Sequence, residues 1–194
     1  MRMWTTFRRD ERGTAITEFA LTAPLFLLIL MGIFDFAWQM YAKQVLSGAV
    51  AEAGRASTLE DNASDQAALD AKVARQVRNV FGNAEVSFSR KAYSSFDEVG
   101  DPENYTDSNK NGQYDSGECF QDVNGNGNWD ADRGKAGNGG ADDVVVYAAS
   151  MEIKRVLPVW RMLGQPQETT IVAKTVLRNQ PYGAATSTST VICK

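Results

Sequence analysis

The stretch that decides the fold begins at residues 12–24, RGTAITEFALTAP, and continues at residues 25–34 as LFLLILMGIF. Apart from Glu18, it contains no charged residue between Gly13 and Asp35. With its flanking small residues, the apolar run has the roughly 20 residues that a membrane-spanning helix needs. A cleaved secretory signal would have a shorter apolar core of about 7–15 residues and a small-residue cleavage site. Because the run continues without such a break, it predicts a retained membrane anchor.

The charges that flank the apolar run predict its orientation in a membrane. Four basic residues precede the run, Arg2, Arg8, Arg9 and Arg12. The nearest basic residue after it is Lys43. Since positive charge accumulates on the cytoplasmic side of a single span, we expect residues 1–13 to be a cytoplasmic leader. Everything after about Tyr41 then lies outside the cytoplasm.

The remaining sequence predicts an α+β outer domain. Residues 14–58 form one long helix in this interpretation, first embedded in the membrane and then amphipathic, and residues 59–194 form the extracytoplasmic domain. Apolar residues at helical spacing predict a second helix from about residue 65 to residue 81. Alternating or β-branched runs predict strands at residues 84–93, 142–157 and 168–179. We expect these strands to form a small antiparallel sheet packed on the helices.

The cysteine and histidine content limits the chemistry of the chain. Cys119 and Cys193 both lie in the outer part, where an oxidising compartment permits a disulfide. The alternative is two independent thiols, because the sequence does not show that the two residues are close. The chain has no histidine, which removes the commonest general base. Without a nucleophile elbow, a phosphate-binding glycine loop or a zinc-ligand spacing, we expect no catalytic residues and no enzymatic activity.

Residues 101–143 differ from the rest of the chain in composition, and we call them the acidic insertion. They contain eight of the sixteen glycines. Ten acidic residues stand against three basic ones, a net charge of −7 within a chain whose formal net charge is −4. Because apolar residues are so few, we expect no hydrophobic core here. The insertion is therefore either disordered or ordered by something other than its own apolar contacts.

A calcium ion is the ordering agent that the first part of the insertion predicts. Residues 107–118, DSNKNGQYDSGE, are called loop 1 and match the EF-hand loop pattern, with Gly112 at the sharp turn. The predicted ligands are Asp107, Asn109, Asn111, Asp115 and Glu118, together with the backbone carbonyl of Gln113. Calcium takes six to eight hard oxygen ligands, which this set supplies. The alternative is a solvated acidic turn that binds no metal.

Residues 122–133, DVNGNGNWDADR, are called loop 2 and repeat the pattern fifteen residues later. The predicted ligands are Asp122, Asn124, Asn126, Asn128 and Asp130. Position 12 is Arg133, which is no ligand, so we expect Asp132 to substitute, or else Asp142 or Asp143. No room remains between the loops for flanking helices, so the pair resembles the helix-free calcium loops of thrombospondin type-3-like or dockerin-like repeats. We expect one or two calcium ions in a structural role, because binding stabilises the ordered state.

The beginning of the chain resembles type IV pilin precursors, which join a basic leader, a glycine, a glutamate five residues later and an apolar helix. The resemblance narrows to TadE-like proteins, minor pilins or pseudopilins of the tight-adherence (Flp) pilus system. It rests on Gly13, Glu18, Phe19, Ala20, Pro24 and Asp35, and on AKTVLRNQPY at residues 173–182. Matching segments cover roughly residues 12–56 and 144–182. The acidic insertion is not a usual feature of that family.

The resemblance implies how the chain is processed and where it acts. A prepilin peptidase would cut between Gly13 and Thr14, creating an α-amino cation that Glu18 of the same or a neighbouring subunit neutralises. The chain would lie in a bacterial inner membrane, with its N-terminus cytoplasmic, and after processing in an extracellular pilus. Its partners would be other pilin or pseudopilin subunits, the peptidase and membrane lipid, with no nucleic acid.

Two functions follow as hypotheses. The first is a minor pilin-like component of the tight-adherence pilus that acts in pilus assembly or surface adhesion, with a calcium-stabilised outer domain. The alternative is a permanently membrane-anchored, calcium-binding adhesion or sensor module that is not incorporated in a pilus. The state of the N-terminus discriminates between them, because only the first requires a chain that begins at Thr14.

Overall fold

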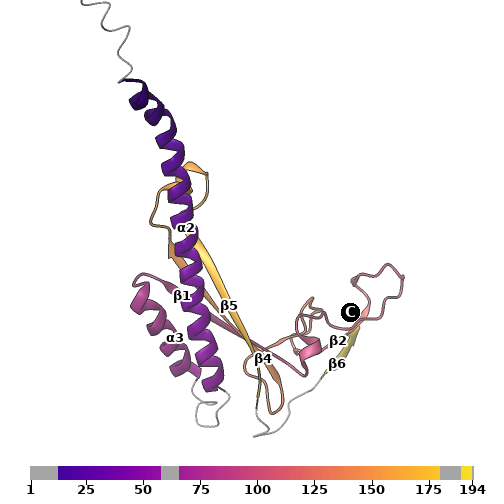
Figure 1. The fold of residues 1–194 in the computed structure, drawn as a ribbon. Helices are drawn as coiled ribbons and strands as arrows, with labels where there is room; N and C mark the ends of the chain where they lie inside the picture. Colours follow the sequence, from indigo (N-terminus) through magenta and orange to yellow (C-terminus); the bar gives the residue numbers. More distant parts are fainter. Residues whose placement is uncertain (1–12, 58–65, 180–188, 194) are drawn as a thin grey trace, which may run out of the picture. The chain divides into compact units, whose positions relative to one another are not determined.

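The computed structural model describes residues 13–57, 66–179 and 189–193 (Figure 1). The predicted leader at residues 1–12, the segment that follows the first helix and most of the C-terminal tail lie outside the described residues. The described helices are α2 (Thr14–Ser57), α3 (Gln66–Val80) and α4 (Val159–Met162), with a 3₁₀ turn η3 (Phe96–Glu98). The described strands are β1 (Glu85–Tyr93), β2 (Cys119–Asp122), β3 (Lys135–Ala136), β4 (Val144–Lys154), β5 (Glu168–Arg178) and β6 (Thr190–Cys193).

These elements confirm the predicted long apolar helix followed by a small domain with an antiparallel sheet and helices. The helices α2 and α3 end within a residue or so of the predicted limits, and β1, β4 and β5 occupy the three predicted strands. The sequence analysis did not predict the short strands β2, β3 and β6. They carry no long alternating or β-branched run, and pairing with distant residues defines them.

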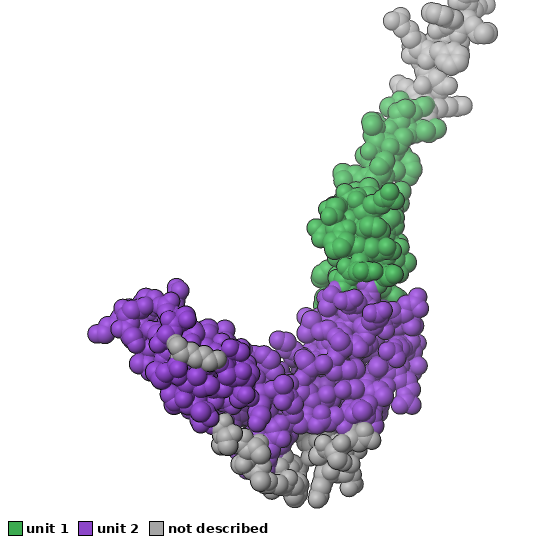
Figure 2. Space-filling model, turned by 180° about the vertical axis from the view of Figure 1, so that it is seen from behind, with its two compact units in different colours: residues 1–41, 154–169 green, residues 42–153, 170–194 purple. Residues whose placement is uncertain are grey.

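The chain divides into two compact units, which are described separately (Figure 2). Unit 1 comprises residues 1–41 and 154–169, and unit 2 comprises residues 42–153 and 170–194. The helix α2 contributes residues to both. The second part of α2 belongs to the same unit as the sheet.

The environment of α2 changes between Tyr41 and Ala42. Before this point most of its large apolar side chains are exposed, up to 82% for Leu21. After it one face is buried, at Ala42, Leu46, Ala49, Val50 and Ala53, none of them more than 3% exposed. The first part thus leaves most of its apolar surface uncovered by protein, as a lipid-facing span does, and the second part is an ordinary amphipathic helix.

In unit 1, the connection between β4 and β5 contacts α2 through an acidic residue. Asp35 is only 9% exposed, and its Oδ2 accepts a hydrogen bond from Gln39 Nε2 at 2.8 Å. Arg155 Nη1 lies 4.0 Å from the same oxygen. A buried carboxylate is tolerated when a cation and a donor accompany it. The carboxylate at the end of the apolar run is thus paired within the protein.

In unit 2, α3 and the second part of α2 lie beside each other and pack with the sheet (Figure 1). The four-stranded sheet has the order β3-β1-β4-β5, and β1 and β4 are antiparallel. The core contains Leu46 and Val50 from α2, Val73 and Val77 from α3, and Met151 from β4. Burying side chains of this size stabilises the fold by roughly 1.5–3 kcal/mol each.

A charged network also joins α3 to the sheet of unit 2. Arg90 on β1 donates two hydrogen bonds to the carboxylate of Asp70, at 2.9 and 2.6 Å. The hydroxyl of Tyr147 on β4 donates to the same carboxylate at 2.8 Å. Burial, followed by the neighbouring Asp70 carboxylate, raises the pKa of Tyr147 above its ordinary value. The network fixes the position of α3 on β1 and β4.

The register of the sheet determines where the acidic insertion begins. Tyr93 at the end of β1 lies opposite Val144 at the start of β4. The insertion therefore leaves the sheet and returns to it at the same end. Within the insertion, β3 pairs with the end of β1, so this part of the insertion is joined to the sheet.

Candidate functional site in the acidic insertion

The strand β2, which joins loop 1 to loop 2, is paired on both sides. On one side it forms an antiparallel pair with β6, in which Phe120 lies opposite Ile192. On the other side Tyr105 forms an isolated bridge with Phe120. The backbone N–H of Thr106 donates to the carbonyl of Cys119 at 2.8 Å. The two loops therefore emerge from one small hydrogen-bonded platform.

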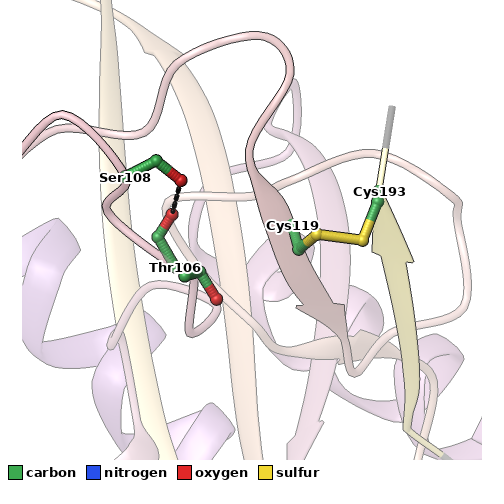
Figure 3. The surroundings of a disulfide bond; sticks show 4 residues. All are labelled: Thr106, Ser108, Cys119 and Cys193. Carbon is green, nitrogen blue, oxygen red and sulfur yellow. Dashed lines mark hydrogen bonds between the residues drawn. A yellow bond between two sulfur atoms is a disulfide. The ribbon is translucent and has the colours of Figure 1, made fainter.

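A disulfide joins the C-terminal strand to this platform (Figure 3). Cys119 and Cys193 lie opposite each other in the β2–β6 pair and are 74 residues apart in the sequence. At the entry to loop 1, Ser108 Oγ donates to the carbonyl of Thr106 at 3.4 Å (Figure 3). The covalent link bridges the chain beyond residue 179 to the strand between the loops.

Four aromatic side chains gather in the insertion and are called the aromatic core, although three of them are half-buried and none belongs to the hydrophobic core of the sheet and helices. Tyr114 and Trp129 stack with their ring centroids 4.9 Å apart. Tyr105 meets both of them edge to face, at 5.9 and 6.0 Å, and Phe120 meets Tyr114 at 5.6 Å. Phe120 is 2% exposed. Single aromatics separated by polar residues produce no apolar run, yet each buries a large area when they gather.

In loop 1, four of the predicted ligand residues turn toward one another. Asp107 accepts hydrogen bonds from the N–H groups of Asn111 at 3.2 Å and Gly112 at 2.8 Å. Asp115 Oδ2 accepts from the side-chain amides of Asn109 and Asn111, both at 2.7 Å. Gly112 has φ +76°, which glycine adopts without strain. Positions 1, 3, 5 and 9 of the pattern therefore converge inside one turn.

Glu118, the predicted ligand at position 12, closes loop 1 with both oxygens. Its Oε1 accepts from the N–H of Ser108 at 2.7 Å, and its Oε2 accepts from the N–H of Asp115 at 3.1 Å. These donors belong to positions 2 and 9 of the loop. The Glu118 side chain is buried, with 5% of the residue exposed. Its carboxylate thus faces the interior of the loop and not solvent.

Loop 2 repeats the same contacts at the corresponding positions. Asp122 accepts from the N–H groups of Gly125 at 2.7 Å and Gly127 at 2.8 Å. Asp130 Oδ2 accepts from the side-chain amides of Asn124, at 2.7 Å, and Asn126. The four side chains at positions 1, 3, 5 and 9 again converge.

Positions 7 and 8 correspond as well. The N–H groups of Gln113 and Asn128, whose carbonyls are predicted ligands, donate to the Asn side chains at position 5, both at 2.7 Å. The residues at position 8 are Tyr114 and Trp129, the stacked pair of the aromatic core. The two loops are therefore built alike and face each other through these rings.

Glu103 closes loop 2, and the sequence analysis missed it. Its Oε1 accepts from the N–H of Val123 at 2.8 Å, and its Oε2 accepts from the N–H of Asp130 at 3.1 Å. These donors are positions 2 and 9 of loop 2, the positions that Glu118 serves in loop 1. Trp129 Nε1 donates to the backbone carbonyl of Glu103 at 2.9 Å, and Glu103 is 0% exposed.

The three predicted substitutes for position 12 make contacts elsewhere. Asp132 accepts from Lys91 Nζ at 2.6 Å, the Tyr93 hydroxyl at 2.8 Å and the N–H of Gly134 at 3.0 Å. Asp142 pairs with Arg178, and the carboxylate of Asp143 accepts from the N–H of Gly140. The carboxylates of all three are thus placed apart from the hydrogen bonds that close loop 2.

The electrostatics around Asp132 follow from these contacts. Burial raises the pKa of Asp132, but the hydrogen bonds from Lys91, Gly134 and Tyr93 outweigh it, so the net shift lowers this pKa. Burial and the same carboxylate raise the pKa of Tyr93 to about 12. Asp132 thus behaves as the partner of a cation and a phenol on β1.

The side chains of both loops carry oxygen donors, the type of ligand that hard cations bind. Carboxylate and amide oxygens suit calcium, whereas the loops offer no thiolate or imidazole. Among the described residues, no group of three or more His, Cys, Asp or Glu stands as a ready metal cluster. One reason is that asparagines hold two positions of each loop and turn their nitrogens toward Asp115 or Asp130. Half a turn of an amide about its Cβ–Cγ bond replaces that nitrogen with oxygen.

The predicted processing residues stand at the start of α2. Thr14 is its first residue, and Glu18 lies one turn later with an exposed side chain. In the part of the chain that the structure describes, no ion pair involves Glu18. By length and composition α2 is a candidate membrane span, and only 6% of its apolar window is buried within the protein.

The comparison with known proteins gives a family match, and it lies on α2. Residues 13–55 match the model of a family described as TadE-like protein. Neither a curated protein nor a solved structure matches the chain. The matched segment is almost the whole of α2 and includes Gly13, Thr14 and Glu18. The similarity is therefore confined to the helix that is also the candidate membrane span.

Proposed function

We propose that the chain is a minor pilin-like component of the tight-adherence pilus, acting in pilus assembly or surface adhesion. The observation that carries this proposal is the match of residues 13–55 to the TadE-like family over a helix that changes character at Tyr41. A helix that is apolar on all sides first and amphipathic afterwards suits a subunit held in a membrane before assembly.

Glu18 has a specific task in this proposal. An ionised carboxylate at the edge of the hydrocarbon region is costly unless a cation neutralises it. Cleavage after Gly13 would create that cation, the α-amino group of Thr14, whose usual pKa is about 7.7–8.0. When subunits pack side by side, the carboxylate of one chain can pair with the amino group of a neighbour. This pairing would set the axial register between subunits.

The test is the N-terminus of the mature chain and the fate of a Glu18→Ala variant. Mass spectrometry should find a chain that begins at Thr14. Glu18→Ala should insert in the membrane normally but be absent from sheared pili. Glu52→Ala, on the same helix but exposed and paired with Lys72, is the matched control and should assemble normally. Normal assembly of Glu18→Ala would disprove the role of this carboxylate.

We also propose that calcium stabilises the acidic insertion. Three carboxylates of the acidic insertion, those of Glu103, Glu118 and Asp122, are at most 5% exposed. Among the described residues, none of them forms an ion pair with a lysine or arginine. Buried negative charge without a cation is costly, and a bound calcium ion would remove that cost. The disulfide supports an oxidising location, where calcium is available at millimolar levels.

The alternative function is a permanently anchored calcium-binding adhesion or sensor module outside any pilus. The same loops and the same span support it, and only the processing step differs. This alternative would be favoured if the mature chain still carries residues 1–13 and is absent from sheared pili.

A further inference from the structure

The two loops belong to a longer internal repeat than the calcium pattern alone. Residues 103–115 read ENYTDSNKNGQYD, and residues 118–130 read ECFQDVNGNGNWD. The shared positions include the aspartates, asparagines and glycine of each loop, and also a glutamate four residues before each loop begins. Glu103 precedes the first residue of loop 1 by four positions, and Glu118 precedes the first residue of loop 2 by four positions. This repeat is a property of the sequence and is independent of the hydrogen bonds.

Each glutamate closes the loop of the other repeat. Glu118 ends loop 1 and accepts from its positions 2 and 9. Glu103, which precedes loop 1, accepts from positions 2 and 9 of loop 2. The platform explains the exchange, since the N–H of Gln121 donates to the carbonyl of Asn104 at 2.8 Å and so holds the two entry segments antiparallel. In an antiparallel pair each entry segment begins where the other ends.

Three carboxylates of the insertion are buried and, among the described residues, pair with no lysine or arginine. Glu103 is 0% exposed and Glu118 is 5% exposed, and their only partners among the described residues are backbone N–H groups. Asp122, the first residue of loop 2, is 4% exposed and is likewise bonded only to N–H groups there. Arg133, which occupies position 12 of loop 2, turns instead to Glu98 and the carbonyl of Pro102. The basic side chain at position 12 of loop 2 therefore pairs with groups other than these carboxylates.

We propose that Glu103 is the twelfth-position ligand of loop 2, so that the insertion is a paired two-calcium centre with exchanged glutamates. This inference rests on the calcium part of the proposed function. The loop 1 site then takes its bidentate carboxylate from Glu118, and the loop 2 site takes its bidentate carboxylate from Glu103. The remaining side-chain oxygens of each site come from its own loop. Calcium loops commonly use a bidentate glutamate at position 12. In loop 2 that position is Arg133, and Glu103 would supply the bidentate carboxylate in its place.

The arrangement couples the two sites mechanically. Glu103 lies four residues before Asp107, so an ion in loop 2 holds the segment that enters loop 1. Glu118 lies four residues before Asp122, so an ion in loop 1 holds the segment that enters loop 2. Tyr114 of loop 1 stacks on Trp129 of loop 2, and this contact holds the two loops in a fixed alignment. Binding at one site should therefore favour binding at the other.

The experiment counts calcium ions bound per chain. Full-length protein in lipid nanodiscs is freed of divalent cations and titrated with calcium chloride alone in a calorimeter. The wild-type chain should bind two ions, Glu103→Gln one and Glu118→Gln one. Asp101→Asn removes an exposed acidic charge two residues before Glu103 and should still bind two. Retention of two ions by Glu103→Gln would overturn the proposal.

Double variants identify which site each glutamate serves. Glu103→Gln with Asp122→Asn should lose no more than one ion, because both changes strike loop 2. Glu103→Gln with Asp107→Asn should lose both ions, because the changes strike different loops. The opposite pattern would assign Glu103 to its own neighbouring loop and would refute the exchange.

Two further results separate this inference from the calcium proposal itself. A wild-type chain that binds no calcium would refute both. A wild-type chain whose bound ions are lost with Glu118→Gln but not with Glu103→Gln would refute only the exchange. If Glu103→Gln loses the near-ultraviolet circular dichroism of the aromatic core before calcium is added, Glu103→Asp replaces it. This shorter carboxylate should weaken one of the two sites at least tenfold, and unchanged affinity at both sites would overturn the proposal.

Discussion

Removing the disulfide should destabilise the acidic insertion without unfolding the core of unit 2. The perturbation is the double variant Cys119→Ser with Cys193→Ser. The link closes a loop of 74 residues. The loop-closure relation then gives about 4 kcal/mol of stabilisation at 25 °C. Apart from its backbone pairing with β2, side-chain burial holds β6 only weakly, because Val191 is 70% exposed.

The loss should be local, because the core contains residues of α2, α3, β4 and β5 and none from the platform. Near-ultraviolet circular dichroism reports the stacked aromatic rings of the insertion, and the signal at 222 nm reports the helices. In urea, the near-ultraviolet transition of the variant should move to a lower concentration, while the helix transition stays in place. Val191→Ser, on the same strand with the disulfide intact, is the matched control. A near-ultraviolet shift equivalent to less than about 1 kcal/mol would refute the loop-closure reasoning.

Three further predictions test other parts of the molecule. Chelation of calcium should lower the melting temperature of the aromatic signal, since each site at 100 times its dissociation constant would contribute about 2.7 kcal/mol, and an unchanged midpoint would contradict the calcium proposal. In a denaturant titration, Gly54→Ala should destabilise the core by about 1–3 kcal/mol, because its Cβ would lie 2.9 Å from Thr175 Cγ2 and 3.2 Å from a Leu177 methyl group. The control Gly48→Ala, whose Cβ would meet nothing within 4 Å, should be neutral or stabilising. Because the pKa of Tyr93 is raised from 10 to about 12, the tyrosine of the unfolded chain ionises first as the pH rises. The stability that Tyr93 contributes should therefore be intact below pH 10 and lost between pH 10 and about 12. Tyr93→Phe should flatten part of this pH dependence of the unfolding free energy, and an unaltered slope would argue against the raised pKa.

The sequence was sufficient for features that neighbouring residues determine. The apolar run and the helix-forming residues after it predict α2 almost to its last residue, because helical periodicity is a local property. The alternation of apolar residues and the β-branched runs likewise locate β1, β4 and β5. The spacing of Asp107, Asn109 and Asn111 predicts a turn whose side chains converge, since three residues on alternate positions of a tight loop have little choice of direction.

Only the tertiary structure decided which distant groups complete these local elements. The partner of loop 2 is Glu103, nineteen residues before Asp122, and nothing in the spacing within loop 2 points to it. Asp132 has the right chemistry and adjacency for that loop, yet Lys91 and Tyr93 of β1 hold it. Likewise, the aromatic core exists only because β2 brings the two loops together. Contacts across long separations depend on how strands pair, and that pairing is set by the fold as a whole and not by any one segment.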